Sequence, residues 1–139
     1  MSSDKRPIVV FDTNMLLLMA DGVAVLDHIE EELETKPRCV VIKPVYDEIC
    51  RIASSSNSVL LRKRALLALK LVNEFCEVVD YKLLNHEDVD SAIVRFALEN
   101  NAIVASNDRE LRKKLRKLGI PEAYFREESK RVKVDGYYK

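Results

Sequence analysis

Short apolar runs and longer half-polar segments alternate along the chain. The strand-like runs cover residues 8–11, 39–42, 76–79, 102–105 and 123–125. Helical spacing of apolar residues marks the segments 22–34, 57–75, 90–100 and 108–118, and a further helix is expected after Pro44. Because strands and helices alternate, the pattern predicts an α/β fold with a central parallel sheet of about five strands and helices on both faces.

Residues that favour helix ends support two of these boundaries. Asn57 is a suitable N-cap for the helix 57–75. Gly119, followed by Pro121, is expected to end the helix 108–118, because glycine readily adopts the backbone conformation that closes a helix.

Length and composition limit the kind of protein. The 139 residues, 47% of them hydrophobic, predict a single folded domain over residues 1–139 with a basic tail from about 126 to 139. No apolar run approaches the roughly 18 residues of a membrane-spanning helix, so no membrane partner is expected. The apolar stretch Met15–Ala20 has neither a basic region before it nor a cleavage site after it. We therefore expect a cytoplasmic protein without a signal peptide.

The three cysteines, Cys39, Cys50 and Cys76, are odd in number and lie far apart in the sequence. This spacing fits neither a disulfide framework nor a zinc site. We interpret them as reduced cysteines in the core of a cytoplasmic protein, where a free cysteine acts as a small hydrophobic residue.

Four carboxylates stand at corresponding places around the predicted strands. Asp12 follows the first strand, Glu48 lies about one turn into the segment after the strand 39–42, Asp90 opens a helix, and Asp108 follows the strand 102–105. The carboxyl ends of parallel strands meet at one edge of a sheet. A helix that leads back into such a strand also begins at that edge, so we expect all four side chains to lie close together.

Carboxylates gathered at one edge repel each other. Two unit charges 4 Å apart cost about 4 kcal/mol at an effective dielectric constant of 20. The site must therefore spread its acids, protonate some of them or hold a cation. Oxygen ligands alone favour Mg²⁺ or Mn²⁺ over zinc, and such an ion lowers the pKa of bound water. The sequence thus predicts phosphodiester hydrolysis.

Each acid also has a simpler explanation. Asp108 could cap the following helix, and Asp90 could interact with the helix dipole. Glu48 could be an ordinary exposed helix residue. Asp12 is the hardest to explain in this way. Because all four acids are expected at one edge of the sheet, together they indicate a metal site more strongly than any one of them does.

Charge is unevenly distributed, although the net charge is zero. Residues 1–36 carry 3 basic and 8 acidic side chains, residues 37–108 carry 9 and 10, and residues 109–139 carry 11 and 5. A basic region beside an acidic cluster suits a nucleic-acid-cleaving site, because cations hold the phosphates and carboxylates hold the metal.

Basic residues cluster in three places, beside aromatic residues in the tail, as expected of a site for single-stranded RNA. The candidate RNA contacts are Arg109, Arg112 and Lys113 in the helix 108–118, Arg62 and Lys63 in the helix 57–75, and Arg126 in the tail. Any one cluster could instead be a solubilising surface. Arg109 is the strongest candidate, because it follows a candidate metal ligand.

Four segments resemble the PIN-domain nucleases in order and spacing. They are Val9–Asn14, Val45–Ile49, Asp90–Ile93 and Ala105–Leu111. The resemblance implies a Rossmann-like three-layer fold and the hydrolysis of RNA phosphodiesters with Mg²⁺ or Mn²⁺. It implies that Asp12, Glu48, Asp90 and Asp108 bind the metal directly or through water. It also implies supporting roles for Asn14 and Ser106 behind the ligands. Asp88 is a departure from the family pattern, a spare acid that could assist or replace Asp90.

The tail and the segment after Asp108 look most like one branch, the archaeal proteins similar to pre-ribosomal-RNA processing nucleases. We therefore expect a metal-dependent endoribonuclease of single-stranded RNA, acting in ribosomal RNA processing or RNA quality control. The alternatives are a ribonuclease toxin of a toxin–antitoxin pair, a non-catalytic RNA-binding or ribosome-assembly factor, and a phosphatase or receiver-type phospho-acceptor built on Asp12. Asn14 replaces the second acid of the Asp-X-Asp pattern expected of one common phosphatase class. Expected partners are RNA, a ribosomal precursor or an antitoxin, and a second copy of the chain, since dimers are common in this family.

Overall fold

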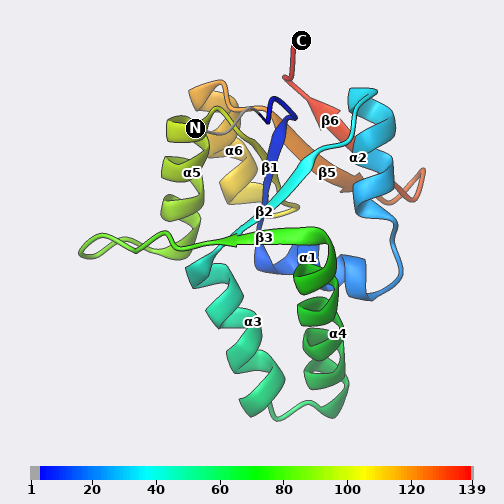
Figure 1. The fold of residues 1–139 in the computed structure, drawn as a ribbon, viewed down its shortest axis with the longest axis vertical. Coiled ribbons are helices and arrows are strands. Elements are labelled where there is room, and N and C mark those ends of the chain that lie inside the picture. The colour runs from blue at the N-terminus through cyan, green and yellow to red at the C-terminus, as the bar shows by residue number, and fades with distance from the viewer. Residues whose placement is uncertain (1–3, 139) are drawn as a thin grey trace.

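A mixed sheet with helices around it forms the fold in the computed structural model, which describes residues 4–138 (Figure 1). The strands are β1 (Ile8–Phe11), β2 (Arg38–Ile42), β3 (Cys76–Val79), β4 (Ile103–Ala105), β5 (Glu122–Arg126) and β6 (Arg131–Asp135). The helices are α1 (Thr13–Ala20), α2 (Val25–Leu33), α3 (Lys43–Ser55), α4 (Val59–Phe75), α5 (Val89–Asn100) and α6 (Arg109–Leu118). The predicted α/β class is confirmed.

The strands lie in the order β3-β2-β1-β4-β5-β6. β1 to β5 are parallel, as expected, whereas β6 pairs with β5 in the antiparallel direction. The expectation of a basic tail after about residue 126 is therefore wrong for 131–135. In this segment Val132 and Val134 alternate with charged residues, which is the period of a strand with one buried face. The density of basic residues obscured that alternation.

Helix α2 lies along the outer edge of β6 (Figure 1). His28 accepts a hydrogen bond at Nδ1 from the Val132 N–H at 3.1 Å, and Glu32 accepts one from the Val134 N–H at 3.2 Å. These side chains thus accept hydrogen bonds from backbone N–H groups on the free edge of β6. Without them, these groups would be open to pairing with a strand of another chain.

The apolar stretch Met15–Ala20 forms most of α1, a helix that the sequence pattern did not predict. Met15, Leu16 and Leu17 are buried, so their hydrophobicity belongs to the core. Within residues 4–138, no helix is long and apolar enough to cross a membrane. Helix α4 begins one residue later than expected, because Ser58 rather than Asn57 accepts the capping hydrogen bond, from the Leu61 N–H.

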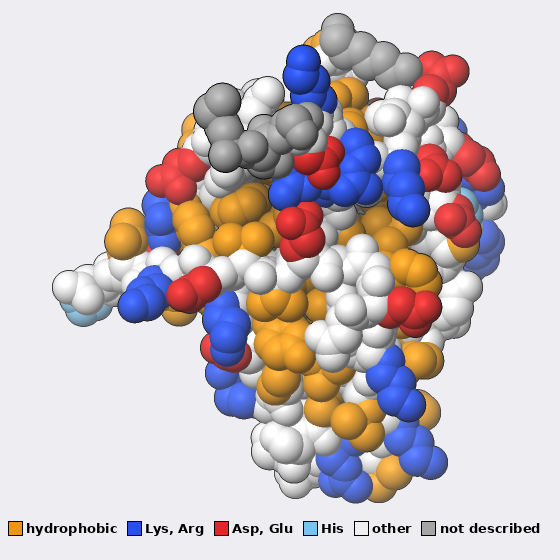
Figure 2. All heavy atoms as spheres, in the orientation of Figure 1, with side chains coloured by type: hydrophobic (Ala, Val, Ile, Leu, Met, Phe, Trp, Pro, Cys, Tyr) orange, Lys and Arg blue, Asp and Glu red, His pale blue; other side chains and the backbone are white. Residues whose placement is uncertain are grey.

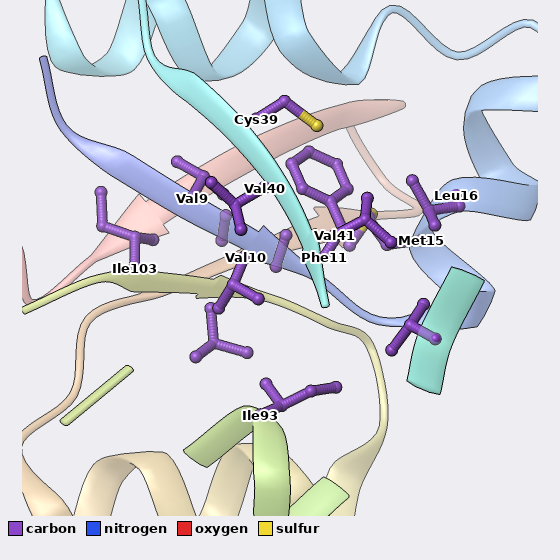
Figure 3. Close-up of a cluster of buried hydrophobic side chains, with 14 of the residues drawn as sticks. Val9, Val10, Phe11, Met15, Leu16, Cys39, Val40, Val41, Ile93 and Ile103 are labelled. Carbon is purple, nitrogen blue, oxygen red and sulfur yellow. The ribbon is translucent and has the colours of Figure 1, made fainter. Parts of the chain in front are cut away.

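The core surrounds the central strand β1. Val9, Val10 and Phe11 are fully buried, and Figure 3 shows them among side chains of α1 and α5, including Met15 and Ile93. Since β1 is covered on both faces, its carboxyl end is held firmly in place. This end carries the first of the predicted acids.

Cys39 and Cys76 form a disulfide bond between β2 and β3. The expectation that all three cysteines are reduced is therefore wrong, and only Cys50 is free within the described residues. The parallel register sets Cys39 directly opposite Cys76, with a Cα–Cα distance of 4.6 Å. The two cysteines lie 37 residues apart in the sequence, and this spacing does not reveal the strand register that brings them together.

Candidate active site

The carboxyl ends of β1 and β4 lie at the switch point of the sheet, where the order of successive strands reverses. The chain leaves β1 toward β2 and β3 on one side, and β4 and β5 lie on the other. Ligands in open α/β sheets bind beyond the strand ends at such a point. The Asp12 N–H donates to the Ala105 carbonyl at 3.1 Å, so the ends of the two strands are joined where the acids begin.

Asp12 is the most deeply buried of the four predicted carboxylates. Its side chain is 6% exposed and accepts a hydrogen bond at Oδ1 from the Met15 N–H at 2.8 Å. Asp12 is therefore the N-cap of α1, and the interpretation of Asp12 as the acid least explained by capping is wrong. Capping leaves lone pairs on both carboxylate oxygens, so it does not prevent Asp12 from binding a cation.

Ser106 joins the ends of β1 and β4 through its side chain. This fully buried hydroxyl donates to Oδ2 of Asp12 at 2.5 Å and accepts from the Asp108 N–H at 3.0 Å. One hydroxyl thus positions both the Asp12 carboxylate and the turn that carries Asp108. The neighbouring Asn107 accepts a hydrogen bond from the Phe125 N–H at 2.8 Å and ties the same turn to β5.

Two further acids also cap helices. Asp108 accepts from the Leu111 N–H at 3.0 Å as the N-cap of α6, and Asp88 accepts from the Ser91 N–H at 2.8 Å as the N-cap of α5. Hydrogen bonds from Ser91 lower the pKa of Asp88. Asp88 is therefore held charged at the start of α5, beside the candidate ligand Asp90.

The carboxylates influence one another's protonation. Burial, the largest influence, raises the pKa of Asp12 to about 6; hydrogen bonds from Ser106 and Met15 oppose this rise, and the charges of Asp90 and Asp108 add to it. Burial also raises the pKa of Asp90, with further contributions from neighbouring acids that include Asp108 and Glu48. The structure thus brings the four predicted acids into one electrostatic cluster.

Glu48 enters this cluster from α3, where it is partly buried. Its Oε1 accepts a hydrogen bond from the Thr13 hydroxyl. Thr13 was not among the predicted site residues. Its place directly after Asp12, within the segment Val9–Asn14 that resembles the PIN-domain nucleases, was the signal in the sequence. Asn14, the next residue, is exposed at the same edge.

The residues present fit a hard divalent cation, because the donors are carboxylate and hydroxyl oxygens and the acids carry mutually repelling charge. Among residues 4–138, no group of three His, Cys, Asp or Glu side chains is already arranged as a metal-binding set.

The predicted RNA contacts differ in how their charges are engaged. Arg109 is exposed at the first position of α6, and Lys63 is exposed on α4. Lys113 lies 3.7 Å from Glu110, and Arg126 lies 3.6 Å from Glu128. Arg62 donates to the Ser56 carbonyl at 2.8 Å, which leaves part of its guanidinium available.

Arg112 has a structural role. Its Nε contacts the buried Glu122 carboxylate at 2.6 Å, and its guanidinium stacks on the Tyr124 ring at 3.9 Å from the centroid. A buried carboxylate requires a paired cation, and Arg112 supplies it. We therefore leave Arg112 out of the RNA contacts proposed below.

Lys114 was not singled out from the basic helix by the sequence. This exposed side chain lies on α6, and its charge acts to lower the pKa of both Asp88 and Asp90. No ion pair involving Lys114 occurs within residues 4–138 at 4.0 Å or less. Of the basic residues on α6, Lys114 is thus the one whose charge reaches the acids at the start of α5.

Two hollows differ in their relation to these acids. A cavity of about 630 Å³ lies beside the disulfide, lined by Cys39, Cys76 and Phe75, and contains none of the predicted site residues. A groove of about 470 Å³ contains Asn14 and Glu48 and therefore adjoins the carboxylates.

The doubly wound sheet, with acids at its switch point, defines an α/β protein that binds its ligand beyond the carboxyl ends of the strands. The sequence model of the family described as a PIN like domain matches residues 9–128. The chain therefore belongs to the PIN-domain nuclease family, as the sequence resemblance predicted.

Two known proteins are similar to this chain. Ribonuclease VapC4 of Methanocaldococcus jannaschii is 34% identical over 123 residues, which cover 86% of this chain and 90% of that protein. The structure of the PIN domain endonuclease Utp24 aligns with a TM-score of 0.74 and 20% identity, over 95% of this chain and 93% of its own. At this identity, the second comparison shows a shared fold.

Proposed function

We propose that this protein is a metal-dependent endoribonuclease that hydrolyses phosphodiester bonds of single-stranded RNA. The observation that carries the proposal is the buried Asp12 carboxylate, whose pKa is raised by burial and by the charges of Asp90 and Asp108. Burying an acid beside other acids is unfavourable without a cation. The 34% identity to a protein named as a ribonuclease supports RNA as the substrate.

Asp12, Glu48, Asp90 and Asp108 would hold Mg²⁺ or Mn²⁺, directly or through water. When bound, such an ion lowers the pKa of water and neutralises charge on the phosphate. Ser106 orients the Asp12 carboxylate through its 2.5 Å hydrogen bond. Thr13 does the same for Glu48, and Asn14 lies beside them on α1. These contacts limit the movement of the acids and so favour one geometry at the reacting phosphate.

Cations at the rim would hold the RNA backbone. Arg109 follows Asp108 at the start of α6, and the charge of Lys114 acts to lower the pKa of Asp90 on α5. Lys63 lies on α4, the helix that follows α3. Contacts to phosphates make affinity depend on salt, with a slope that falls as each contact is removed. Arg109→Ala should therefore weaken RNA binding and reduce its salt dependence; unchanged affinity and slope would remove Arg109 from the site.

Cleavage of a fluorescent single-stranded RNA with Mn²⁺ tests the activity, with wild type and Asp12→Asn purified in parallel. We expect cleavage by the wild type and a loss of at least about a hundredfold in the variant, since Asp12 is a proposed ligand. Equal cleavage by the two proteins would show that a contaminant is responsible. Absence of cleavage, with no Mn²⁺ binding by calorimetry, would favour a non-catalytic RNA-binding or ribosome-assembly factor.

Ribosomal RNA processing or RNA quality control in the cytoplasm is the first proposed role, with a ribosomal precursor as the substrate. A ribonuclease toxin is the second proposed role. The basic tail was the reason to prefer ribosomal RNA processing, and its charges are largely neutralised by acidic side chains. Arg131 and Lys133 contact Glu31 and Glu32 of α2, and Lys130 contacts Glu127. Co-purification with a small inhibitory partner would support the toxin role, and association with precursor ribosomal particles would support processing.

A further inference from the structure

A groove between α1, α3 and α4 leads away from the candidate metal ligands. One end is formed by Thr13, Asn14 and Glu48, which belong to the acidic edge. The groove has a volume of about 470 Å³, within the roughly 300–1,000 Å³ of small-molecule sites. We name it the α1 groove. Because Glu48 borders both places, a ligand in the α1 groove would lie next to a phosphate at the acids.

We propose that the α1 groove holds a nucleobase of the RNA strand, next to the phosphodiester that is cleaved. The inference rests on the proposed ribonuclease activity and goes beyond it, because it assigns a base-binding subsite to residues outside the acidic cluster.

The walls of the α1 groove are apolar and come from all three helices. Leu18 of α1, Ile52 of α3 and Leu61 of α4 are each partly buried, and Leu17 lies beneath them at 6% exposure. A base of single-stranded RNA is flat and apolar on its faces, so contact with these walls can remove apolar surface of the base from water. Proteins bind splayed bases of single-stranded RNA between such side chains.

Polar groups at both ends match the polar parts of a nucleotide. The exposed Asn14 amide makes no hydrogen bond to any residue in the range 4–138, so its donor and acceptor can pair with the edge of a base. At the far end Arg64 forms two hydrogen bonds of 2.8 Å with Asp21, which fix its guanidinium. The adjacent Lys63 is exposed and can contact the next phosphate.

Cations lie at the end of the α3–α4 hairpin, beyond the α1 groove. Figure 2 shows Lys and Arg side chains around the lower end of the α3–α4 hairpin, where the segment Arg62–Arg64 lies near the beginning of α4. A strand that passes from the acids along the groove toward α4 would meet Asp21, whose charge is balanced by Arg64, and beyond it the exposed cation Lys63. This complementarity favours RNA over an acidic peptide as the occupant.

Single-abasic RNA substrates test the subsite together with matched leucine variants. Leu61→Ala removes a groove wall, whereas Leu60→Ala removes the neighbouring leucine, which is 71% exposed and outside the groove. For wild type, one abasic position beside the cut should lower kcat/KM about tenfold, as expected for one lost base contact. For Leu61→Ala, kcat/KM on intact RNA should fall by a similar factor. The RNA that lacks the base beside the cut should then give this variant no further loss of kcat/KM.

Leu60→Ala should behave as wild type on every substrate, and circular dichroism with thermal unfolding should show that both variants are folded. The subsite would be overturned if the losses in kcat/KM from Leu61→Ala and from base removal were additive at every abasic position. An unchanged kcat/KM in Leu61→Ala would also overturn it. In that case an apolar segment of a protein partner would be the better occupant. If Leu61→Ala does not fold, Leu18→Ala applies the same test, because Leu18 is a partly buried wall of the groove.

RNA affinity separates failure of this inference from failure of the proposed activity. Fluorescence anisotropy with the same RNA and Ca²⁺ measures binding without requiring cleavage. A weaker affinity in Leu61→Ala but not in Leu60→Ala would support the subsite even in a protein that does not cleave RNA. Equal affinities of both variants and wild type would overturn it, whether or not wild type cleaves.

Discussion

The Ser106 hydroxyl and the Asp12 carboxylate are joined by a buried hydrogen bond of 2.5 Å, although they lie 94 residues apart in the sequence. The bond is possible because β4 pairs directly with β1 and both strands end at the same edge. It also links Asp12 to the Asp108 turn, whose N–H donates to the same hydroxyl. The order of the active site therefore depends on one small polar side chain.

Ser106→Ala should reduce kcat/KM about tenfold to a hundredfold, the usual effect of removing a residue that orients a metal ligand. Loss of a donor to a buried carboxylate should also lower the free energy of unfolding by about 1–3 kcal/mol. Kinetics with Mn²⁺ and urea unfolding measure the two effects. Ser106→Thr keeps the hydroxyl and is the matched control, so equal losses in both variants would contradict a role for the hydrogen bond.

Asp12→Asn should stabilise the metal-free protein at neutral pH. Folding raises the pKa of Asp12 from 3.8 to about 6, so the folded state favours the protonated acid. This contribution to stability is present below pH 3.8 and is lost as the pH rises through 6. The difference between the two pKa values corresponds to about 3 kcal/mol.

Urea unfolding in EDTA from pH 4 to 7.5 measures this dependence. The advantage of Asp12→Asn over wild type should grow as the pH rises through 6, and added Mg²⁺ should reduce it by stabilising only the wild type. A difference that stays constant with pH would contradict a buried Asp12 with a raised pKa.

Arg112→Ala should destabilise the protein by about 3 kcal/mol, the lower end for a broken buried ion pair, because Arg116 also lies 3.4 Å from Glu122. Adding Glu122→Gln should recover part of the loss, since the unpaired buried charge is then removed. Thermal unfolding measures both. Lys113→Ala is the control, because the neighbouring Lys113 side chain is 68% exposed. A stable Arg112→Ala with reduced RNA affinity would contradict the structural role.

Thiol titration of the denatured, unreduced protein should detect one thiol, that of Cys50, because Cys39 and Cys76 are bonded. Detection of three thiols would contradict the disulfide. Reduction should lower the free energy of unfolding by about 2–4 kcal/mol, since the bond closes a loop between residues 37 positions apart. Cys39→Ser should show the same loss without reductant, and Cys50→Ser should not.

The central elements could be predicted from the sequence because their signals are local. Five apolar runs marked the parallel strands, and strand direction alone predicted that Asp12, Glu48, Asp90 and Asp108 share one edge. The cap at Gly119 also agrees with the structure, where its backbone is left-handed and closes α6. These predictions needed only periodicity and the rules of parallel sheets.

The remaining features depend on which segments become neighbours. The role of Arg112 depends on Glu122 of the next strand, and the disulfide depends on the register of β2 and β3. Strand β6 was hidden because its charged positions face outward and pair with α2. Such pairings are set by tertiary packing, which no local pattern reports.

Anomalous diffraction from a crystal soaked in Mn²⁺ tests the central claim most directly. The account predicts an ion at the edge of the sheet where β1 and β4 end, with oxygens of Asp12 and at least one of Asp90, Asp108 and Glu48 in its coordination sphere, directly or through water. The same soak of Asp12→Asn should show weaker occupancy there. A wild-type crystal with no ion at these carboxylates, at a Mn²⁺ concentration that supports RNA cleavage, would contradict the account.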